Sequence, residues 1–531
     1  MLLALPPAAL FAVWLGLLLA TFGKTVRVIY SNADIVSAPV IGELLPRAPD
    51  GAVTTLGFLP WYSTLWFELA TRWVPFHRIL WEVGPWLASL AGIALVAWST
   101  AKAAGRWAGW LVAFALVCSG DRLLTIQFAS DLHGATVLYV CVLDAFLVLL
   151  VQRAGRIGGM PSHVCCCALV AAIAAAGLAS DDLLYIAGLV PFVLAGLAQV
   201  WWQPRAVGRR IGVSVASVAV LAIAGSQIAI AAMRGVHVYA ASNRFTFAAW
   251  EDLIRNVLRL LQSLAELFNG DFGGATVGAR SILTFVSAAA FACAVVIAAQ
   301  VVRDQLRRLR TSQRSITAVR DAQVLFWATT ALVTSAVFVF SSFAEVSGGR
   351  YVVTVAYGIV VLAAVGVAGR GYAVRGAASV AACLVVTGSV VALAAGDIRG
   401  NSGHYPQRDF AHFLSTFAQA EGLKYGYASY WVAAALTWET KTRVEVYPAL
   451  TCSAPAGLCT YPLHNISSWY TPRAGERSFV VLDTRYGPSA ADLHLAGSQR
   501  SLTYGRYTIV VYDHDIAANL GDWRRYGVDA S

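Results

Sequence analysis

Residues 31–45 read SNADIVSAPVIGELL and open the first long loop of the chain. They follow an apolar segment at 2–22, so Asp34 stands close to the point where that segment would leave a membrane. A second acid, Glu43, stands nine positions further on. The apolar residues between the two acids have the spacing of one face of a helix. If the protein is an enzyme, we expect Asp34 to be at the centre of its active site, with the rest of the chain as a scaffold around this loop.

Composition indicates a membrane protein. Of the 531 residues, 58% are hydrophobic and 13% are charged, and the mean hydropathy is +0.64. A soluble globular protein has about 25% charged residues, so this deficit is typical of an integral membrane protein. The net charge of +10 does not indicate nucleic acid as a partner, because the basic residues cluster in short loops between apolar segments.

These apolar segments predict an α-helical polytopic membrane protein with about 11 transmembrane helices. Several segments are shorter than the roughly 20 residues that a bilayer requires, and the one at 107–120 is the weakest. The segments lie near 2–22, 79–100, 107–120, 134–151, 163–179, 183–202, 211–232, 281–302, 323–343, 351–369 and 378–396.

Arg-rich loops alternate with Arg-poor ones along the chain, which by the positive-inside rule places the Arg-rich set in the cytoplasm. The N-terminus is then cytoplasmic, while the loops 23–78 and 233–280 and the tail lie outside. We predict a multi-pass protein of the inner (plasma) membrane, with a transmembrane domain at 1–396 and an external α/β domain at 397–531. The basic loop residues are Lys102, Arg106, Arg153, Arg156, Arg205, Arg209, Arg210, Arg303, Arg307, Arg308, Arg310, Arg314, Arg320, Arg370 and Arg375.

Both long outer loops contain sequences suited to a membrane surface. The stretch 59–81 is dense in aromatic residues, Trp81 among them, which is typical of an interfacial belt. Loop 23–78 is therefore expected to lie along the outer face, in contact with lipid. The stretch 250–268 predicts an amphipathic helix that lies either in the interface or beneath the external domain.

Charged residues also occur in the short turns between spans. Asp131 and His133 precede one span, Asp181 and Asp182 separate two others, and Arg350 stands at the start of a late span. Charged groups near membrane depth are costly and often functional. The alternative is that such acids only cap the helix that follows.

The tail has a different composition, with strands predicted at 425–428, 443–446, 479–482 and 507–512 and an amphipathic helix before them. It contains no Gly-rich phosphate loop, nucleophile elbow or zinc-ligand spacing, so we interpret it as a lid, a docking site or an acceptor-binding module. Cys452 and Cys459 are the only cysteines in this external region, where an oxidising compartment favours a disulfide between them.

Over nearly its whole length the chain resembles membrane glycosyltransferases of the GT-C fold, in particular the bacterial branch related to protein O-mannosyltransferases and lipid A aminoarabinose transferases. The features that carry the resemblance are Asp34 in the first outer loop, the sequence Asp131-Leu132-His133 in the second, the pair Arg350-Tyr351 at a late span, and the segment 423–448 in the tail. Many relatives have two adjacent acids in the first loop, whereas this chain has Asp34 alone.

The resemblance implies a reaction with three partners: the lipid bilayer, a polyprenyl-phosphate sugar donor, and the hydroxyl group of a glycan, lipid or protein acceptor. It implies that Asp34 is the general base of an inverting transfer and that Arg350 and Tyr351 bind the donor phosphate. Asp131, His133, Asp181 and Asp182 are candidates for binding metal or substrate. A divalent cation (Mg or Mn) could be held by Asp34, Asp131 and His133, since carboxylate and imidazole both serve divalent ions.

Two alternatives remain from the sequence. A lipid or ion transporter would use buried acids as a path across the membrane, but here the acids gather on one side. A non-catalytic scaffold with the same fold would explain why the first loop has a single acid.

Overall fold

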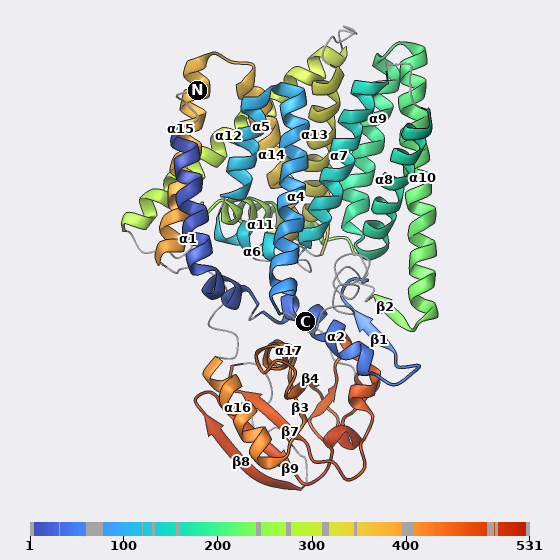
Figure 1. The fold of residues 1–531 in the computed structure, drawn as a ribbon, viewed down its shortest axis with the longest axis vertical. Helices are drawn as coiled ribbons and strands as arrows, with labels where there is room; N and C mark the ends of the chain where they lie inside the picture. The colour runs from blue at the N-terminus through green and yellow to red at the C-terminus, as the bar shows by residue number, and fades with distance from the viewer. Residues whose placement is uncertain are drawn as a thin grey trace.

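The structure is a computed structural model of the chain. The helices form a tall bundle, and a smaller α/β unit, here called the C-terminal unit (Arg408–Tyr526), lies against one end of it (Figure 1). The structure describes residues 5–30, 32–59, 78–118, 120–129, 133–154, 160–240, 246–271, 278–310, 318–342, 344, 348–395, 408–485, 493 and 497–526.

Ten helices in the described part of the chain are long and apolar enough to cross a membrane, which confirms a polytopic membrane protein. The predicted segment at 107–120 is different: α5 (Arg106–Val117) and α6 (Asp121–Phe128) meet at 87°, so they form a broken span or a re-entrant loop, the eleventh if counted as one. The ten helices are α1 (Leu5–Ile29), α4 (Arg78–Ala104), α7 (Ala135–Arg153), α8 (Met160–Ser180), η4 with α9 (Tyr185–Leu189 and Val190–Trp202), α10 (Arg205–Gly235), α12 (Ala279–Arg310), α13 (Ala318–Phe340), α14 (Gly349–Ala368) and α15 (Tyr372–Ala395).

Helices α7 and α14 form the centre of the bundle. Their apolar windows are 78% and 83% buried, whereas those of α12 and α15 are 11% and 17% buried and expose apolar side chains at the periphery. Lipid can cover such side chains at no hydrophobic cost, so the peripheral helices need no further protein partner. The central helix α14 begins at Gly349, and its first turn therefore carries Arg350 and Tyr351 at the end of the bundle that faces the C-terminal unit (Figure 1).

A six-stranded sheet organises the C-terminal unit, with strand order β5-β4-β3-β7-β9-β8. The central strand β3 runs parallel to both β4 and β7, and the other pairs are antiparallel. Helix α16 packs on this sheet through Phe410 and Leu414, and α17 follows β3 directly. The elements are α16 (Arg408–Glu421), β3 (Tyr425–Ser429), α17 (Tyr430–Glu439), β4 (Glu445–Thr451), β5 (Leu458–Thr460), β7 (Phe479–Asp483), β8 (Ser498–Tyr504), β9 (Tyr507–Tyr512) and α18 (Trp523–Tyr526).

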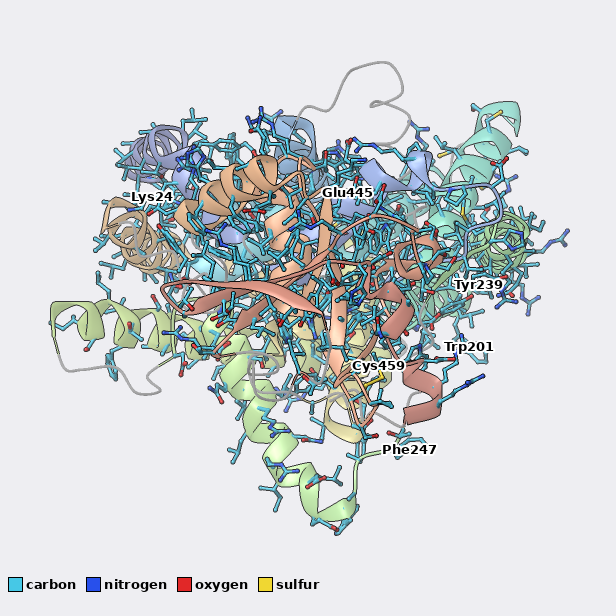
Figure 2. The ribbon with its side chains drawn as sticks, turned by 90° about the horizontal axis from the view of Figure 1, so that it is seen from below. Lys24, Trp201, Tyr239, Phe247, Glu445 and Cys459 are labelled. Carbon is cyan, nitrogen blue, oxygen red and sulfur yellow. A yellow bond between two sulfur atoms is a disulfide. The ribbon has the colours of Figure 1, made fainter. Side chains whose placement is uncertain are left out.

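A second, three-stranded sheet joins three distant parts of the chain. Strand β1 (Thr54–Leu56) pairs in parallel with β2 (Val238–Ala240) and antiparallel with β6 (Asn465–Ile466). The two long loops of the bundle and the C-terminal unit thus share backbone hydrogen bonds. Seen from below, Tyr239 of β2 lies toward one edge of the molecule, and Glu445 of β4 lies nearer its middle (Figure 2).

The first long loop is less exposed than the sequence predicts. Helix α2 (Ala33–Leu44) has buried residues on all sides, because α17 of the C-terminal unit packs against it. Trp81, expected in an interfacial belt, is 3% exposed, and its indole N–H donates to Glu43. The expectation that this loop lies on lipid is therefore wrong for α2 and for Trp81. The aromatic residues at 60–77 lie outside the described residues.

The predicted amphipathic helix is α11 (Leu253–Leu267), which lies across the bundle (Figure 1). It packs on α14 and α13 through Leu264 and Leu267, and the Asn256 amide donates to the Val339 carbonyl. Its apolar side chains Ile254, Leu258 and Leu261 point outward and are exposed. This arrangement is the one expected of a helix at a membrane interface.

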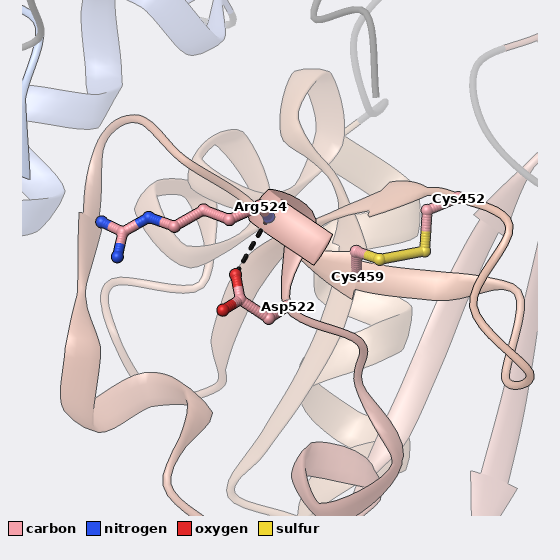
Figure 3. Close-up of a disulfide and its surroundings, with 4 residues drawn as sticks. All are labelled: Cys452, Cys459, Asp522 and Arg524. Carbon is pink, nitrogen blue, oxygen red and sulfur yellow. Dashed lines mark hydrogen bonds between the residues drawn. A yellow bond between two sulfur atoms is a disulfide. The ribbon is translucent and has the colours of Figure 1, made fainter. Parts of the chain in front are cut away.

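Cys452 and Cys459 form a disulfide that links β4 to β5 (Figure 3). The bridge lies beside α18, where the Arg524 backbone N–H donates to Asp522. Replacing both cysteines by serine is expected to lower the free energy of unfolding by about 2–3 kcal/mol, because the unfolded chain regains the entropy of a short open loop. Thermal unfolding without reductant measures the effect, with Cys293→Ser as a control; equal melting temperatures for the double variant and the natural protein would contradict it.

Candidate functional site

Asp34 lies in the first turn of α2, where Asn32 caps the helix by accepting a hydrogen bond from the Asp34 backbone N–H at 2.9 Å. A carboxylate is favoured at this position by the helix dipole. Its side chain is 27% exposed and has partners from two other elements. The Arg350 guanidinium of α14 lies 3.4 Å from Oδ2, and the Tyr430 hydroxyl of α17 donates to Oδ1 at 2.8 Å. Bundle and C-terminal unit therefore meet at this carboxylate.

Arg350 and Tyr351 connect Asp34 to the second predicted cluster. The Arg350 guanidinium lies over the Tyr351 ring, 4.8 Å from its centroid, a cation–π geometry. The Tyr351 ring also contacts the imidazole of His133, at a ring separation of 5.1 Å. The structure thus brings four of the predicted residues, Asp34, Arg350, Tyr351 and His133, into one continuous row of contacts.

His133 is held by Asp181. Its Nδ1 lies 2.7 Å from Asp181 Oδ2, and the Thr136 hydroxyl donates to the same oxygen. The Leu183 backbone N–H donates to the other carboxylate oxygen at 2.9 Å, so Asp181 also caps the following helix, as the alternative reading predicted. Burial alone would raise the pKa of Asp181, but His133 and these hydrogen bonds lower it below its usual value.

The backbone around this pair is unusual. His133 has a φ of 61°, in the left-handed region, and begins a π-helical turn. A second π-helix, η4, begins at Tyr185, a few residues after Asp181. Strained residues and π-turns cluster at functional sites. Asp182 lies beside Asp181, and burial together with the charge of Asp181 raises the pKa of its carboxyl group.

The C-terminal unit contributes residues to this cluster that the sequence did not predict. Tyr430 is 7% exposed, and its ring stacks on Tyr461 at 4.7 Å with His464 at 5.8 Å. Burial and the charge of Asp34 raise the pKa of Tyr430 well above its usual value, so its hydroxyl remains a donor. Burial lowers the pKa of His464, an effect that Asp34 partly opposes. The one sequence signal for Tyr430 was its place in the segment 423–448.

The described residues do not fit a divalent metal site. Among them, no group of three or more His, Cys, Asp or Glu side chains is arranged to hold a cation. The oxygens of Asp34 face a guanidinium and a hydroxyl donor, and those of Asp181 are occupied by three donors. Asp131 lies outside the described residues. Positive charge beside Asp34 is supplied by Arg350.

A pocket of about 250 Å³ opens at the other end of α2, between this helix and the C-terminal unit. Its charged residues are Arg47, Glu445 and Arg473, with an Arg47–Glu445 distance of 3.6 Å. Glu43 lies near this end and is bound to Trp81, outside the Asp34 cluster; burial raises the pKa of Glu43. The two acids of the opening stretch therefore have different surroundings.

The helical bundle and the C-terminal α/β unit make up a multi-pass membrane protein, and the likeness to two solved structures gives it the GT-C fold that the sequence predicted. The solved structure of ArnT from Cupriavidus metallidurans bound to undecaprenyl phosphate is similar to this chain, with a TM-score of 0.55 and 12% identity, covering 96% of this chain and 97% of that one. ArnT from the same organism in the apo state has a TM-score of 0.55 at 11% identity, covering 96% and 99%. No protein-family model and no curated protein sequence matches the chain.

Proposed function

We propose that the protein is a membrane glycosyltransferase that moves a sugar from a polyprenyl-phosphate donor to an acceptor hydroxyl at the outer face of the membrane. The observation that carries the proposal is the Asp34 carboxylate, which is partly exposed and lies beside the Arg350 guanidinium at the end of the bundle. A base and a phosphate-binding cation are the two groups that such a transfer requires. The similarity in fold to ArnT, which has been solved with undecaprenyl phosphate, supports a lipid-linked donor.

In the proposed mechanism, Asp34 is the general base and Arg350 binds the leaving group. Asp34 accepts the proton of the acceptor hydroxyl as the oxygen attacks the anomeric carbon. The bond between that carbon and the phosphate oxygen breaks, its electron pair remains on the phosphate, and the anomeric centre is inverted. A positioned base contributes about 10²–10⁴-fold, and Arg350 stabilises the charge that develops on the phosphate.

The contact between Arg350 and Asp34 suits an exchange of partners. At 3.4 Å, with side chains 29% and 27% exposed, it is a long and partly hydrated ion pair, and such pairs contribute about 0–1 kcal/mol. A phosphate offers Arg350 shorter, bidentate hydrogen bonds. Donor binding therefore draws the guanidinium toward the phosphate and leaves a carboxylate oxygen of Asp34 available for the acceptor proton.

We assign His133 and Asp181 a supporting role beneath the phosphate site. Asp181 fixes the imidazole ring, the imidazole contacts the Tyr351 ring, and Tyr351 lies under the guanidinium of Arg350. The row orients Arg350 without requiring a metal ion. Tyr351 can also contribute its hydroxyl to the donor phosphate.

A transfer assay tests this function directly. Purified protein in lipid nanodiscs is incubated with a panel of polyprenyl-phosphate sugars and candidate acceptors, and products are identified by mass spectrometry. Release of polyprenyl phosphate with sugar transfer, lost in Asp34→Asn, supports the proposal. A protein that moves lipid or ions across proteoliposomes, with no transfer from any donor, would instead be a transporter.

The proposed orientation gives a separate prediction. The Arg-rich loops place the C-terminal unit outside the cytoplasm, so a reporter enzyme that works only outside should be active when fused after Arg399. Fusion of the same reporter after Arg310, in an Arg-rich loop, serves as the inactive control. Activity at the second site and none at the first would reverse the orientation and move the active site to the cytoplasmic face.

A further inference from the structure

We propose that Tyr430 is a positioning residue for Asp34, which makes the C-terminal unit a part of the catalytic site. The inference rests on the proposed function of Asp34 as the general base. Its starting observation is the hydrogen bond of 2.8 Å from the Tyr430 hydroxyl to Asp34 Oδ1, which spans 396 residues of sequence. Oδ2, on the other side of the carboxylate, faces Arg350.

Neighbouring rings hold the Tyr430 side chain in place. Tyr461 stacks on it at 4.7 Å with an interplanar angle of 7°, and Trp431 packs edge-on at 5.2 Å. His464 completes the group, and a Cβ on Gly57 would come within 2.7 Å of its imidazole, so only glycine fits there. A tyrosine has few rotatable bonds, and these contacts fix the direction of its hydroxyl.

The C-terminal unit is itself held in register with Asp34 by backbone contacts. Helix α17 packs on α2, which carries Asp34, and β6 pairs with β1. Next to this pair, the Ser467 backbone N–H donates to the Val53 carbonyl at 2.7 Å, and the Ser467 hydroxyl accepts from the Val53 N–H at 2.9 Å. Tyr430 therefore reaches Asp34 from a unit that is fixed against the same loop.

This hydrogen bond gains importance once the donor binds. When Arg350 turns to the phosphate, Tyr430 remains as the partner that keeps the carboxylate in one orientation. Its hydroxyl cannot replace Asp34 as the base, because it stays protonated in this surrounding. Among the described residues, the charged and titratable groups that face Asp34 are Arg350 from α14, Tyr430 from α17, and Tyr461 and His464 from the segment before β6.

Tyr430→Phe tests the role because it removes the hydroxyl and keeps the stacked ring. We expect kcat to fall about tenfold, the value of one charge-assisted hydrogen bond, while the donor KM stays within about twofold, since the phosphate site is untouched. Tyr427→Phe is the matched control: its buried hydroxyl donates to the Trp469 carbonyl within the C-terminal unit.

A second readout does not depend on activity. A carbodiimide modifies accessible carboxyl groups, so the extent of Asp34 labelling at one fixed pH can be followed by mass spectrometry in membranes. Labelling of Asp34 should increase in Tyr430→Phe, where Oδ1 loses its hydrogen bond, and not in Tyr427→Phe. If labelling and kcat are unchanged in Tyr430→Phe while Asp34→Asn is inactive, the inference about Tyr430 is wrong and the proposed function still stands. Full activity of Asp34→Asn would overturn the proposed role of Asp34 as the base, while the labelling comparison would still show whether Tyr430 acts on Asp34.

Discussion

Asp34→Asn is expected to reduce turnover by at least about 100-fold, while the protein still folds and binds its donor. Asparagine is as good as aspartate at the start of a helix, and Asn32, which supplies the cap, is unchanged. The single amide oxygen can still accept the hydrogen bond from Tyr430, while the NH2 group replaces the oxygen that faces Arg350. The amide cannot take the acceptor proton, and the long ion pair with Arg350 is weak, so most of the loss reports base catalysis. Single-turnover transfer, compared with binding of the donor, measures the two effects separately.

Glu43→Gln is the matched control for Asp34→Asn, since it neutralises the other acid of α2. In the described residues, Glu43 contacts Trp81 and has no direct contact with Asp34. We therefore expect the turnover of the Glu43→Gln variant to stay near that of the natural protein. Near-normal transfer by Asp34→Asn would remove Asp34 as the base. The search would then move to Asp131, or to Asp181 and Asp182.

Arg350→Gln should lower kcat/KM by about 10²–10³-fold, the effect of removing a group that stabilises developing charge. We expect a large part of the loss in the donor KM, because the guanidinium contacts the phosphate before as well as during the reaction. The kcat/KM of Arg350→Lys should lie between those of Arg350→Gln and the natural protein, since an ammonium group keeps the charge but cannot bind in a bidentate manner. Titration of polyprenyl phosphate binding, next to initial rates, measures both parts.

Arg370→Gln provides the comparison at the opposite end of α14. Arg370 follows that helix and donates to Gln300, far along the bundle from Asp34. The Arg370→Gln variant should bind the donor and transfer the sugar as the natural protein does. If the Arg350 and Arg370 variants lose equal activity, or if Arg350→Gln keeps the donor affinity of the natural protein, Arg350 does not bind the phosphate.

Hydropathy predicted the spans well because burial in lipid depends mainly on length and composition. The break in the segment 107–120 was not predictable in this way. Helices α5 and α6 turn by 87° around Cys118, and the α6 end is fixed by contacts such as the Gln127 amide with the Leu116 carbonyl. Such a bend depends on where polar groups find partners in three dimensions. The same holds for α2, whose outer face is covered by α17, an element almost 400 residues later.

Most residues of the candidate site could be predicted from the sequence, but their contacts with one another could not. Asp34, His133 and Arg350 stood out because charges are rare beside apolar spans. Their contacts cross up to 316 residues between Asp34 and Arg350, and no local pattern encodes such a pairing. Tyr430 was missed for a different reason: a tyrosine at the start of a helix in the tail has many structural roles, and only its position against Asp34 distinguishes it.

The small sheet of β1, β2 and β6 determines when this site can exist during biosynthesis. Val53 and Ser467, which bond to each other beside that sheet, are 414 residues apart. A ribosome adds about 5–20 residues per second, so roughly 20–80 s separate the synthesis of the two. Until then β1 has an open edge, and open strand edges are prone to wrong pairing. A chain that ends before Tyr461 lacks that ring, His464 and β6, so premature termination there yields a membrane-inserted protein that cannot assemble the cluster around Asp34.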